Sequence, residues 1–399
     1  MTEADIVALM TWIVGEGLAG RSETDLIGGF CERIGAHGVP LKRAIAFIDT
    51  LHPLYEGRAF RWERGIAGVT STDYGRSIDG EGAERWRASP FHRLLQTGES
   101  LLRRRLSAES AAEFAILRGD AIALMTDYVA IVDRFDAQGA IGGMDCFYSS
   151  WMTSRPEGFA SAHVDLLRRL TPFLGLAVKS ASLGRMAQTL VETYLGRDAG
   201  RRVLQGRIAR GVSDRIEAAL WFSDLRNFTR ITDTAPPEQI IPMLNDYADV
   251  IISAIHENGG DVLKLIGDGV LAIFPAEQRR QACAAALDAA RSARSAVEAL
   301  NIRRAGDGLP VSDTYLGLHV GEVFYGNIGS SDRLDFTVIG PAVNEVSRIA
   351  AMCRSADQPL LLSGAFAAAA GDSGAFVSVG RYALRGVARP QELFTLDRL

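Results

Sequence analysis

The spacing of apolar residues changes several times along the second half of the chain. Apolar residues dominate Ala218–Ser223, which predicts a buried strand, and a helical spacing follows Pro236-Pro237-Glu238. Two further strands, Asp261–Ile266 and Val270–Phe274, are separated by Gly267-Asp268-Gly269, a typical hairpin connection. The predicted helix between the first strand and this hairpin presents one apolar face, made of Ile240, Ile241, Leu244, Tyr247, Ile251 and Ile255.

Three more strands are predicted towards the C-terminus, at Tyr315–Val320, Val323–Ile328 and Phe336–Ile339. An alanine-rich helix around Ala282–Ala299 precedes them. Helices interspersed with hairpin-forming strands are typical of helices packed over a mainly antiparallel sheet. We therefore expect an α+β domain over residues 213–399.

The first half of the chain, residues 1–185, mixes the two spacings. The segment Gly143–Thr153 is rich in aromatic residues and predicts a strand, and Phe159–Ser182 has the apolar spacing of a helix. Residues 186–212 are amphipathic and rich in arginine. We interpret them as a helical linker between two domains, with a solvated surface helix as the alternative.

Length and composition limit the class of protein. A chain of 399 residues exceeds the usual size of one core, which favours two or three domains. The net charge of -5 disfavours nucleic acid as a partner. Cys31, Cys146, Cys283 and Cys353 form no CxxC pair, the N-terminus is acidic, and no apolar run is long enough to span a bilayer. We therefore expect a cytoplasmic protein without a membrane span.

Two carboxylates stand where strands end. Asp224 follows the strand Ala218–Ser223, and Asp268 lies in the predicted hairpin. If those strands are neighbours, the two side chains converge and repel each other unless a cation binds between them. Oxygen ligands without histidine or cysteine favour Mg²⁺ or Mn²⁺, and two such ions are the usual device for displacement at phosphorus. The alternative is a helix cap at Asp224 and a simple turn residue at Asp268.

Lysine is unusually rare in this chain. Of the 43 basic residues only three are lysines, namely Lys42, Lys179 and Lys264. A lysine kept among so many arginines indicates a place that needs a compact charge, although chance is the alternative explanation.

Three motifs in the second half resemble those of the class III adenylate and guanylate cyclases. The first is Phe222-Ser-Asp224-Leu225-Arg-Asn227-Phe228-Thr229. The second is Gly259-Gly260-Asp-Val-Leu-Lys264-Leu-Ile-Gly267-Asp268-Gly269. The third combines Gly321–Gly329 with Phe336-Thr337-Val-Ile-Gly340-Pro-Ala-Val343-Asn344-Glu-Val-Ser-Arg348. The resemblance runs from about Glu217 to the C-terminus, in order and in spacing, and implies a ferredoxin-like catalytic domain.

The resemblance implies a role for each matching residue. Asp224 and Asp268 would bind two metal ions, helped by the Leu225 carbonyl. Backbone amides of Asn227, Phe228 and Thr229 would hold the triphosphate. Lys264 and Thr337 would contact the base. Asn344 would orient the ribose, Arg348 would stabilise charge on the α-phosphate, and Arg385 would contact phosphate near the C-terminus.

These residues favour ATP as the substrate and cyclic AMP as the product. A lysine supplies only donors, which suits the ring acceptor of adenine, and a threonine can accept from the exocyclic amine. Guanylate cyclases of this family carry a glutamate where Lys264 stands. The chain departs from the commonest pattern at Thr337, where many relatives have aspartate, at Asn227, where glycine is common, and at Arg385, where lysine is common.

Family sites are shared between two subunits, so one catalytic domain per chain implies a homodimer with two composite sites. The layout of residues 1–185 weakly resembles a GAF-like α/β sensor for an unknown small-molecule or protein effector. His52 as a haem or metal ligand and Cys146 as a redox group are the less favoured readings there. Alternative functions are a guanylate cyclase, a diguanylate cyclase, or a catalytically silent sensor or partner-binding protein on this fold.

Overall fold

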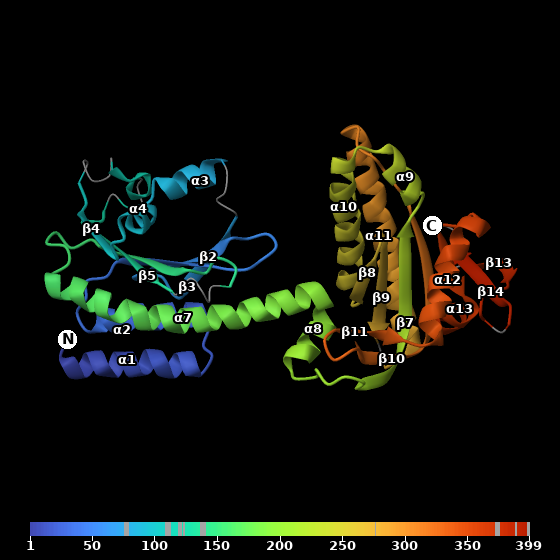
Figure 1. Cartoon of the computed structure of the whole chain (residues 1–399), viewed down its shortest axis with the longest axis horizontal. Coiled ribbons are helices and arrows are strands. Elements are labelled where there is room, and N and C mark those ends of the chain that lie inside the picture. Colours follow the sequence, from blue (N-terminus) through green and yellow to red (C-terminus); the bar gives the residue numbers. More distant parts are fainter. Residues whose placement is uncertain are drawn as a thin grey trace. The chain divides into compact units, whose positions relative to one another are not determined.

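A computed structural model gives the fold of the chain. It describes residues 1–75, 80–107, 113–118, 122, 124–135, 141–275, 277–371, 376–387 and 389–396. The chain forms two compact units, Met1–Leu190 and Val191–Leu399 (Figure 1). Among the described residues, no helix combines the length and the hydropathy required to cross a membrane.

The N-terminal unit is built on a six-stranded sheet in the order β3-β2-β1-β6-β5-β4. Its recorded strand pairs are antiparallel, which differs from the α/β arrangement expected for this half. The GAF-like assignment stays a prediction. The strands are β1 (Arg43–Asp49), β2 (Gly57–Glu63), β3 (Val69–Tyr74), β4 (Leu101–Arg105), β5 (Asp127–Arg134) and β6 (Cys146–Thr153).

Helices cover both faces of this sheet (Figure 1). On β5, Val129 and Ile131 pack with the core formed by α1 (Glu3–Leu18), α2 (Glu23–Ala36) and α7 (Ser161–Leu195). The intervening Tyr128, Ala130 and Val132 face the opposite core, which also contains residues of α3 (Gly80–Arg87) and α4 (Pro90–Thr97). A short 3₁₀ turn spans Ala115–Leu117. Both faces of β5 are therefore buried, which explains its nearly continuous apolar sequence.

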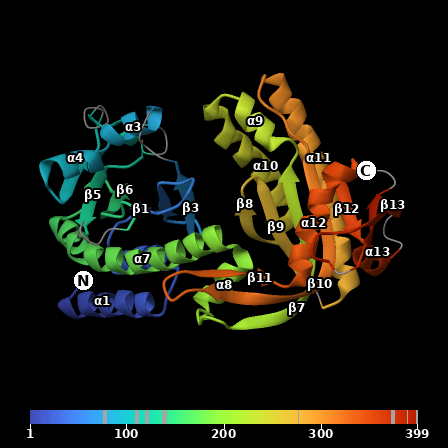
Figure 2. The same cartoon turned by 45° about the vertical axis from the view of Figure 1, so that its right-hand side comes forward.

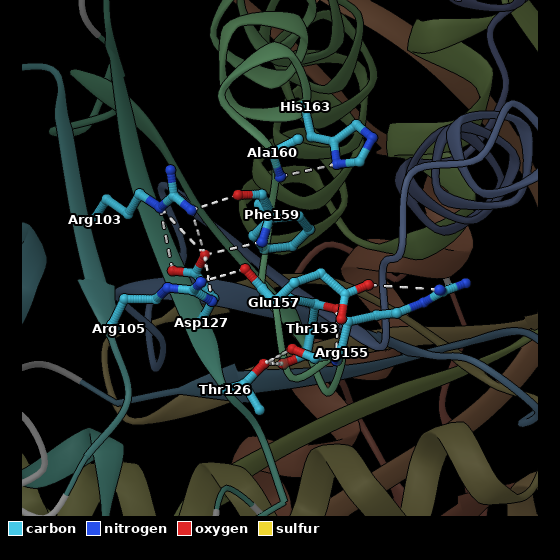
Figure 3. Close-up of polar contacts among 10 residues, drawn as sticks. All are labelled: Arg103, Arg105, Thr126, Asp127, Thr153, Arg155, Glu157, Phe159, Ala160 and His163. Atoms are coloured by element: carbon cyan, nitrogen blue, oxygen red, sulfur yellow. Dashed lines mark hydrogen bonds and ion pairs between the residues drawn. The ribbon is translucent and has the colours of Figure 1, made fainter.

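A buried ion pair fixes the turn before α7 (Figure 3). The Asp127 carboxylate is fully buried and accepts hydrogen bonds from Arg103 Nη2 at 2.6 Å and from the Phe159 amide at 2.9 Å. Arg103 also donates to the Phe159 carbonyl, and Arg105 donates to the Glu157 carbonyl. Buried carboxylates need such partners, so this cluster ties the start of α7 to β4 and β5.

The C-terminal unit contains an eight-stranded sheet, in the order β13-β14-β12-β10-β7-β9-β8 with β11 paired to β10. The strands are β7 (Ser213–Leu225), β8 (Asp261–Ile266), β9 (Gly269–Pro275), β10 (Thr314–Gly329), β11 (Leu334–Ile339), β12 (Leu360–Ser363), β13 (Phe376–Tyr382) and β14 (Gln391–Leu396). The helices are α8 (Arg197–Leu204), α9 (Phe228–Thr234), α10 (Pro237–Glu257), α11 (Arg279–Gly306), α12 (Pro341–Ala356) and α13 (Gly364–Ala370).

The centre of this unit is a βαββαβ arrangement. The chain runs from β7 through α10 to the β8–β9 hairpin, then through α11 to β10, and the four strands lie in the order β8-β9-β7-β10. This is the ferredoxin-like topology. Residues of α10, α11 and α13 form the core on one face, whereas α8 and α12 pack on the other (Figure 2).

Two predicted elements differ from the structure. The strands expected at Tyr315–Val320 and Val323–Ile328 are one continuous strand, β10, because Gly321 stays in the ladder opposite Ala218. The helix expected at Phe159–Ser182 continues to Leu195 as α7, and α8 ends at Leu204, before the C-terminal end of the predicted linker 186–212. A Cβ at Gly321 would meet the Ala342 side chain, which explains a glycine inside a strand.

Candidate active site

The two candidate metal-binding carboxylates come from neighbouring strands. β7 pairs with β9 up to the partners Ser223 and Val270, so the end of β7 lies beside the β8–β9 hairpin. Asp224 is the residue after Ser223, and Asp268 lies in the two-residue hairpin turn whose first residue, Gly267, has φ of +64°. Glycine at the first turn position matches the favoured hairpin geometry.

One backbone amide joins the two carboxylates. The Leu225 N–H donates to Asp224 Oδ1 at 3.0 Å and to Asp268 Oδ2 at 3.2 Å. Both oxygen atoms therefore lie within 3.2 Å of the same nitrogen atom. The convergence of Asp224 and Asp268, expected from the sequence if their strands were neighbours, is present in the structure.

The proximity of the carboxylates changes the acidity of Asp224. Desolvation of its carboxylate, followed by the hydrogen bonding and negative charge of Asp268, raises the pKa of Asp224 from 3.8 to about 7. The Leu225 amide opposes this shift because it donates to the charged form. A pair of carboxylates that resist joint ionisation is suited to a bound cation.

A cavity of about 580 Å³ opens beside the pair. It is lined by residues of the β7–α9 segment, the hairpin, β10 and α12: Phe222, Asp224, Leu225, Asn227, Phe228, Thr229, Arg230, Asp233, Asp268, Tyr315, Ser347, Ala350, Ala351 and Arg354. The structure thus brings together all the residues expected to bind metal and all three expected to hold the triphosphate through their amides.

The backbone at the start of α9 explains the residue at position 227. Asn227 precedes the helix with φ of +59°, in the left-handed region that favours glycine and that asparagine tolerates better than most residues. The first recorded bond of the helix runs from the Ile231 amide to the Asn227 carbonyl. Amides of the first turn point out of a helix without intrahelical acceptors, so those after Asn227 are available to an anion.

Lys264 and Thr337 lie on strands β8 and β11, outside the lining of that cavity. Thr337 is buried, and it pairs with Gly326 in the β10–β11 ladder. The Lys264 ammonium forms an ion pair with the Asp335 carboxylate, two residues before Thr337. The two residues expected to contact the base are therefore linked through β11.

Asn344 and Arg348 lie on α12, as expected, and Asn344 is exposed. Neither lines the cavity that holds the carboxylates. The Arg348 guanidinium instead packs against the turn that contains Arg385, because a Cβ on Gly386 would lie 3.3 Å from Arg348 Nη1. The structure thus brings Arg348 to the Arg385 turn within one chain, away from Asp224 and Asp268.

Sequence reasoning missed several residues of the site. Ser347, Ala350, Ala351 and Arg354 line the cavity from α12 at helical spacing, and that spacing was the available signal. Asp335 was also missed, although residues two apart on a strand share a face, which places it with Thr337. The tertiary contact of Lys264 with Asp335 leaves no trace in local sequence.

The donor set fits a hard divalent cation held partly by its substrate. In the parts of the chain that the structure describes, no group of three or more histidine, cysteine, aspartate or glutamate side chains is arranged to hold a metal ion. Asp224 and Asp268 supply two carboxylates, and Mg²⁺ is commonly bound by one or two carboxylates together with substrate phosphates and water. The residues present therefore fit Mg²⁺ or Mn²⁺ when a phosphorylated substrate is bound.

Comparison with known proteins covers the C-terminal unit. Residues 213–396 match the family described as "Adenylate and Guanylate cyclase catalytic domain". Adenylate cyclase 1 of Rhizobium meliloti is 30% identical over 177 residues, which are 43% of this chain and 26% of the relative. The adenylate cyclase of Anabaena cylindrica is 36% identical over 143 residues, which are 35% of this chain and 28% of the relative.

A solved structure, the adenylyl cyclase CyaB from P. aeruginosa, is similar over 46% of this chain and 95% of its own, with 25% identity and a TM-score of 0.44. The chain spans about a quarter of the length of the two curated relatives, 26% and 28%. The match covers Asp224, Asp268, the turn at Asn227 and α12. Residues 213–396 therefore belong to the adenylate and guanylate cyclase catalytic domain family.

Proposed function

We propose that this protein is an adenylate cyclase that converts ATP to 3′,5′-cyclic AMP and pyrophosphate. The observation that carries the proposal is the meeting of Asp224 and Asp268 at the Leu225 amide, beside a cavity of about 580 Å³. The adenylate cyclases among its relatives support the same chemistry.

Asp224 and Asp268, with the Leu225 carbonyl, would hold two Mg²⁺ or Mn²⁺ ions. Bound there, the ions would lower the pKa of the ribose 3′-hydroxyl and neutralise charge on the triphosphate. The chain supplies the remaining functions. The amides of Asn227, Phe228 and Thr229 donate to phosphate oxygens, and Arg385 adds a positive charge near them.

Four other residues are proposed to recognise the base and ribose of ATP and to stabilise the charge that develops during the reaction. Lys264 donates to the ring acceptor of adenine, and Thr337 accepts from its amine. Asn344 orients the ribose for attack on the α-phosphate. Arg348 stabilises the charge that develops there, and fixed donors of this kind are worth about 3–4 kcal/mol each.

The proposed active form is a homodimer in which each site takes its metal-binding residues from one subunit and its base-binding and transition-state residues from the other. Within one chain, the cavity around Asp224 lacks Lys264, Thr337, Asn344 and Arg348. Large apolar side chains are exposed on β8 and β11, which carry the base-binding residues, and on β10, which pairs with β11. They support a partner surface there: Leu265 and Ile266 on β8, Phe324 on β10, and Leu334 and Ile339 on β11.

The N-terminal unit is proposed to be a GAF-like regulator that binds an unidentified effector, in a cytoplasmic protein. Its support is α7, which begins inside that unit and continues past Leu190 into the catalytic unit without a break. A continuous helix can transmit a change in one unit to the other.

The direct experiment incubates the purified protein with ATP or GTP and with Mg²⁺ or Mn²⁺, then identifies the products. Cyclic AMP and pyrophosphate in equal amounts are expected from ATP. Cyclic GMP as the main product would establish the guanylate cyclase alternative. Nucleotide binding without turnover would indicate a silent cyclase-fold protein.

A further inference from the structure

A second cavity of the catalytic unit lies between α11 and the sheet. Its volume is about 240 Å³. Its floor is apolar and buried, and it is made of Trp221, Ile251, Ala293, Val297, Leu316 and Leu360. An apolar cavity of about 150 Å³ is large enough to hold benzene, so this one has room for a six-membered ring with a small substituent.

The rim of this cavity is charged. Arg226, Arg294, Glu298 and Asp313 line it, and each of them is exposed or half-buried. The Glu298 carboxylate accepts a hydrogen bond from Arg294 Nε at 3.0 Å, and the Asp313 carboxylate accepts one from the Asn301 amide at 3.3 Å. The two carboxylates thus have partners of their own, which leaves the arginines to receive a ligand at this rim.

Arg294 has a donor that lacks an acceptor. Its Nη1 atom is buried and forms no hydrogen bond with any residue that the structure describes. A buried, charged donor without a partner is destabilising, and each such group in a folded protein needs an explanation. A carboxylate bound in the cavity would supply the missing acceptor, and hydrogen bonds between a guanidinium and a carboxylate are among the stronger ones.

Two residues connect this cavity to the candidate active site. Tyr315 lines both cavities, and it pairs with Asp224 in the β10–β7 ladder. Arg226 stands between Leu225 and Asn227, and its guanidinium lies over the Tyr315 ring, 5.6 Å from the ring centroid. A ligand that fixes Arg226 and Tyr315 would therefore also restrict the turn whose amides are proposed to hold the triphosphate. A segment that one ligand has already ordered loses less entropy when a second ligand binds, so the two ligands should favour each other.

We propose that this cavity binds a small carboxylic acid with an apolar body, of about ten non-hydrogen atoms, and that the bound acid strengthens nucleotide binding at the neighbouring active site. The carboxylate accepts from Arg294 Nη1, and the apolar body fills the floor of the cavity. The site for the acid does not depend on the proposed function, whereas its effect on nucleotide binding rests on that function. The acid takes no part in the cyclisation.

The test uses the full-length protein and para-fluorobenzoate, a ring with one carboxylate, whose binding is followed by fluorine NMR. Two matched probes each lack one feature: para-fluorobenzyl alcohol lacks the charge, and trifluoroacetate lacks the ring. We expect a Kd of about 1 mM or lower for para-fluorobenzoate and binding at least about tenfold weaker for either matched probe. Addition of Mn²⁺ with 3′-deoxy-ATP, which lacks the attacking hydroxyl, should tighten the binding of para-fluorobenzoate about threefold. The acid should tighten the binding of this nucleotide by the same factor, because the coupling is reciprocal.

Variants locate the binding. Arg294→Gln removes the charge and should weaken para-fluorobenzoate at least about tenfold. Arg291→Gln changes an exposed arginine of the same helix that does not line the cavity, and should leave the affinity within about twofold of the wild type. Ala293→Leu fills the floor without changing a charge, and should weaken the acid and the neutral alcohol alike.

Equal affinities for the acid and the alcohol, or no binding of the acid at all, would overturn the site. So would an equal effect of Arg294→Gln and Arg291→Gln, with the Tm of both variants matching that of the wild type. If the acid and the nucleotide both bind but neither changes the affinity for the other, the link to the active site is wrong. A wild type that binds the acid but no nucleotide would refute the proposed function and would still support the acid site.

Discussion

The backbone amide of Leu225, at the end of β7, donates a 3.2 Å hydrogen bond to Asp268 in the β8–β9 turn, 43 residues later in the sequence. The same amide also donates to Asp224, so a single N–H is shared by two negative groups. One neutral donor cannot offset two negative charges, and the pair is therefore a source of repulsion in the metal-free protein. This relationship has a measurable consequence for stability.

The variant Asp224→Asn should remove a pH-dependent loss of stability. The pKa of Asp224 is raised from 3.8 to about 7 on folding, so the folded protein binds more protons than the unfolded chain between these values. The stability of the metal-free wild type, relative to the variant, should fall as the pH rises through this range and level off above about pH 7. Urea unfolding of the catalytic unit across that range provides the measurement.

Adding a divalent metal ion tests whether the pH-dependent loss of stability comes from Asp224. Mg²⁺ is proposed to bind the ionised pair, so it should restore the stability of the wild type at about pH 8 and leave the stability of Asp224→Asn nearly unchanged. Asp249→Asn, at an exposed position on α10, should follow the wild type throughout. If the stability of the wild type and that of Asp224→Asn changed with pH in parallel, the raised pKa of Asp224 would be contradicted.

Two inactive variants should complement each other. Asp268→Ala and Arg348→Ala are each expected to lower the cyclase rate at least about 100-fold. After subunit exchange, half of the dimers carry one chain of each kind, and each such dimer keeps one intact site. The mixture should therefore regain up to about a quarter of the wild-type rate.

The matched control mixes Asp224→Ala with Asp268→Ala. Both changes affect the metal-binding set, so no dimer formed from them has an intact site, and no rescue is expected. Exchange itself is followed by fluorescence transfer between labelled subunits. Absence of rescue in an exchanging mixture of Asp268→Ala and Arg348→Ala would refute shared sites.

The substitution Gly386→Ala should impair catalysis through Arg348. Gly386 has φ of +72°, and an added Cβ would lie 3.3 Å from Arg348 Nη1, so the guanidinium has to move. We expect kcat to fall about tenfold with little change in KM, because the proposed role of Arg348 is to stabilise charge that develops in the transition state. Steady-state kinetics with ATP measures both constants.

Gly308→Ala is the control for backbone strain. Gly308 has φ of +69°, and an added Cβ there meets nothing within 4 Å. Both variants should therefore lose about 1 kcal/mol of stability from the left-handed backbone, but only Gly386→Ala should lose kcat. An equal loss of kcat in both would show that Arg348 is not the cause.

The Asp127 cluster predicts a local loss of stability. Asp127→Asn leaves the fully buried site without the charge that pairs with Arg103 at 2.6 Å, and we expect the N-terminal unit to lose about 3 kcal/mol. Hydrogen exchange should show earlier opening at the start of α7, where the Phe159 amide loses its carboxylate acceptor. Asp165→Asn, exposed on α7, should change neither measurement. A wild-type exchange pattern in Asp127→Asn would contradict this role.

The sequence allowed the hairpin and its carboxylate to be predicted because the signals are local. Gly267-Asp268-Gly269 has the glycine that the turn requires, and β8 and β9 lie within two residues of their predicted ends. The convergence of Asp224 with Asp268 depended on β7 and β9 being neighbours, which spacing suggests but cannot establish. Recognition of the family motifs supplied that missing tertiary information.

Other features of the site depend on contacts that spacing does not encode. The break expected near Gly321 does not exist, because a long partner strand, β7, keeps β10 continuous through it. The pairing of Lys264 with Asp335 joins two strands that are not adjacent in the order of the sheet. The packing of Arg348 against Gly386 likewise depends on a turn far along the chain.

The joint between α7 and α8 is attached to the strand that carries Lys264. Gly196 lies at this joint with φ of +91°, and a Cβ there would clash with the Val262 carbonyl. The Asp198 amide also approaches the Asp261 carboxylate at 3.4 Å. Lys264 is only two residues beyond Val262 on β8. A twist delivered along α7 would therefore move β8 and its proposed base-binding residue, Lys264, first. If the proposed function holds, we expect regulation to change the apparent substrate affinity before it changes the chemical step.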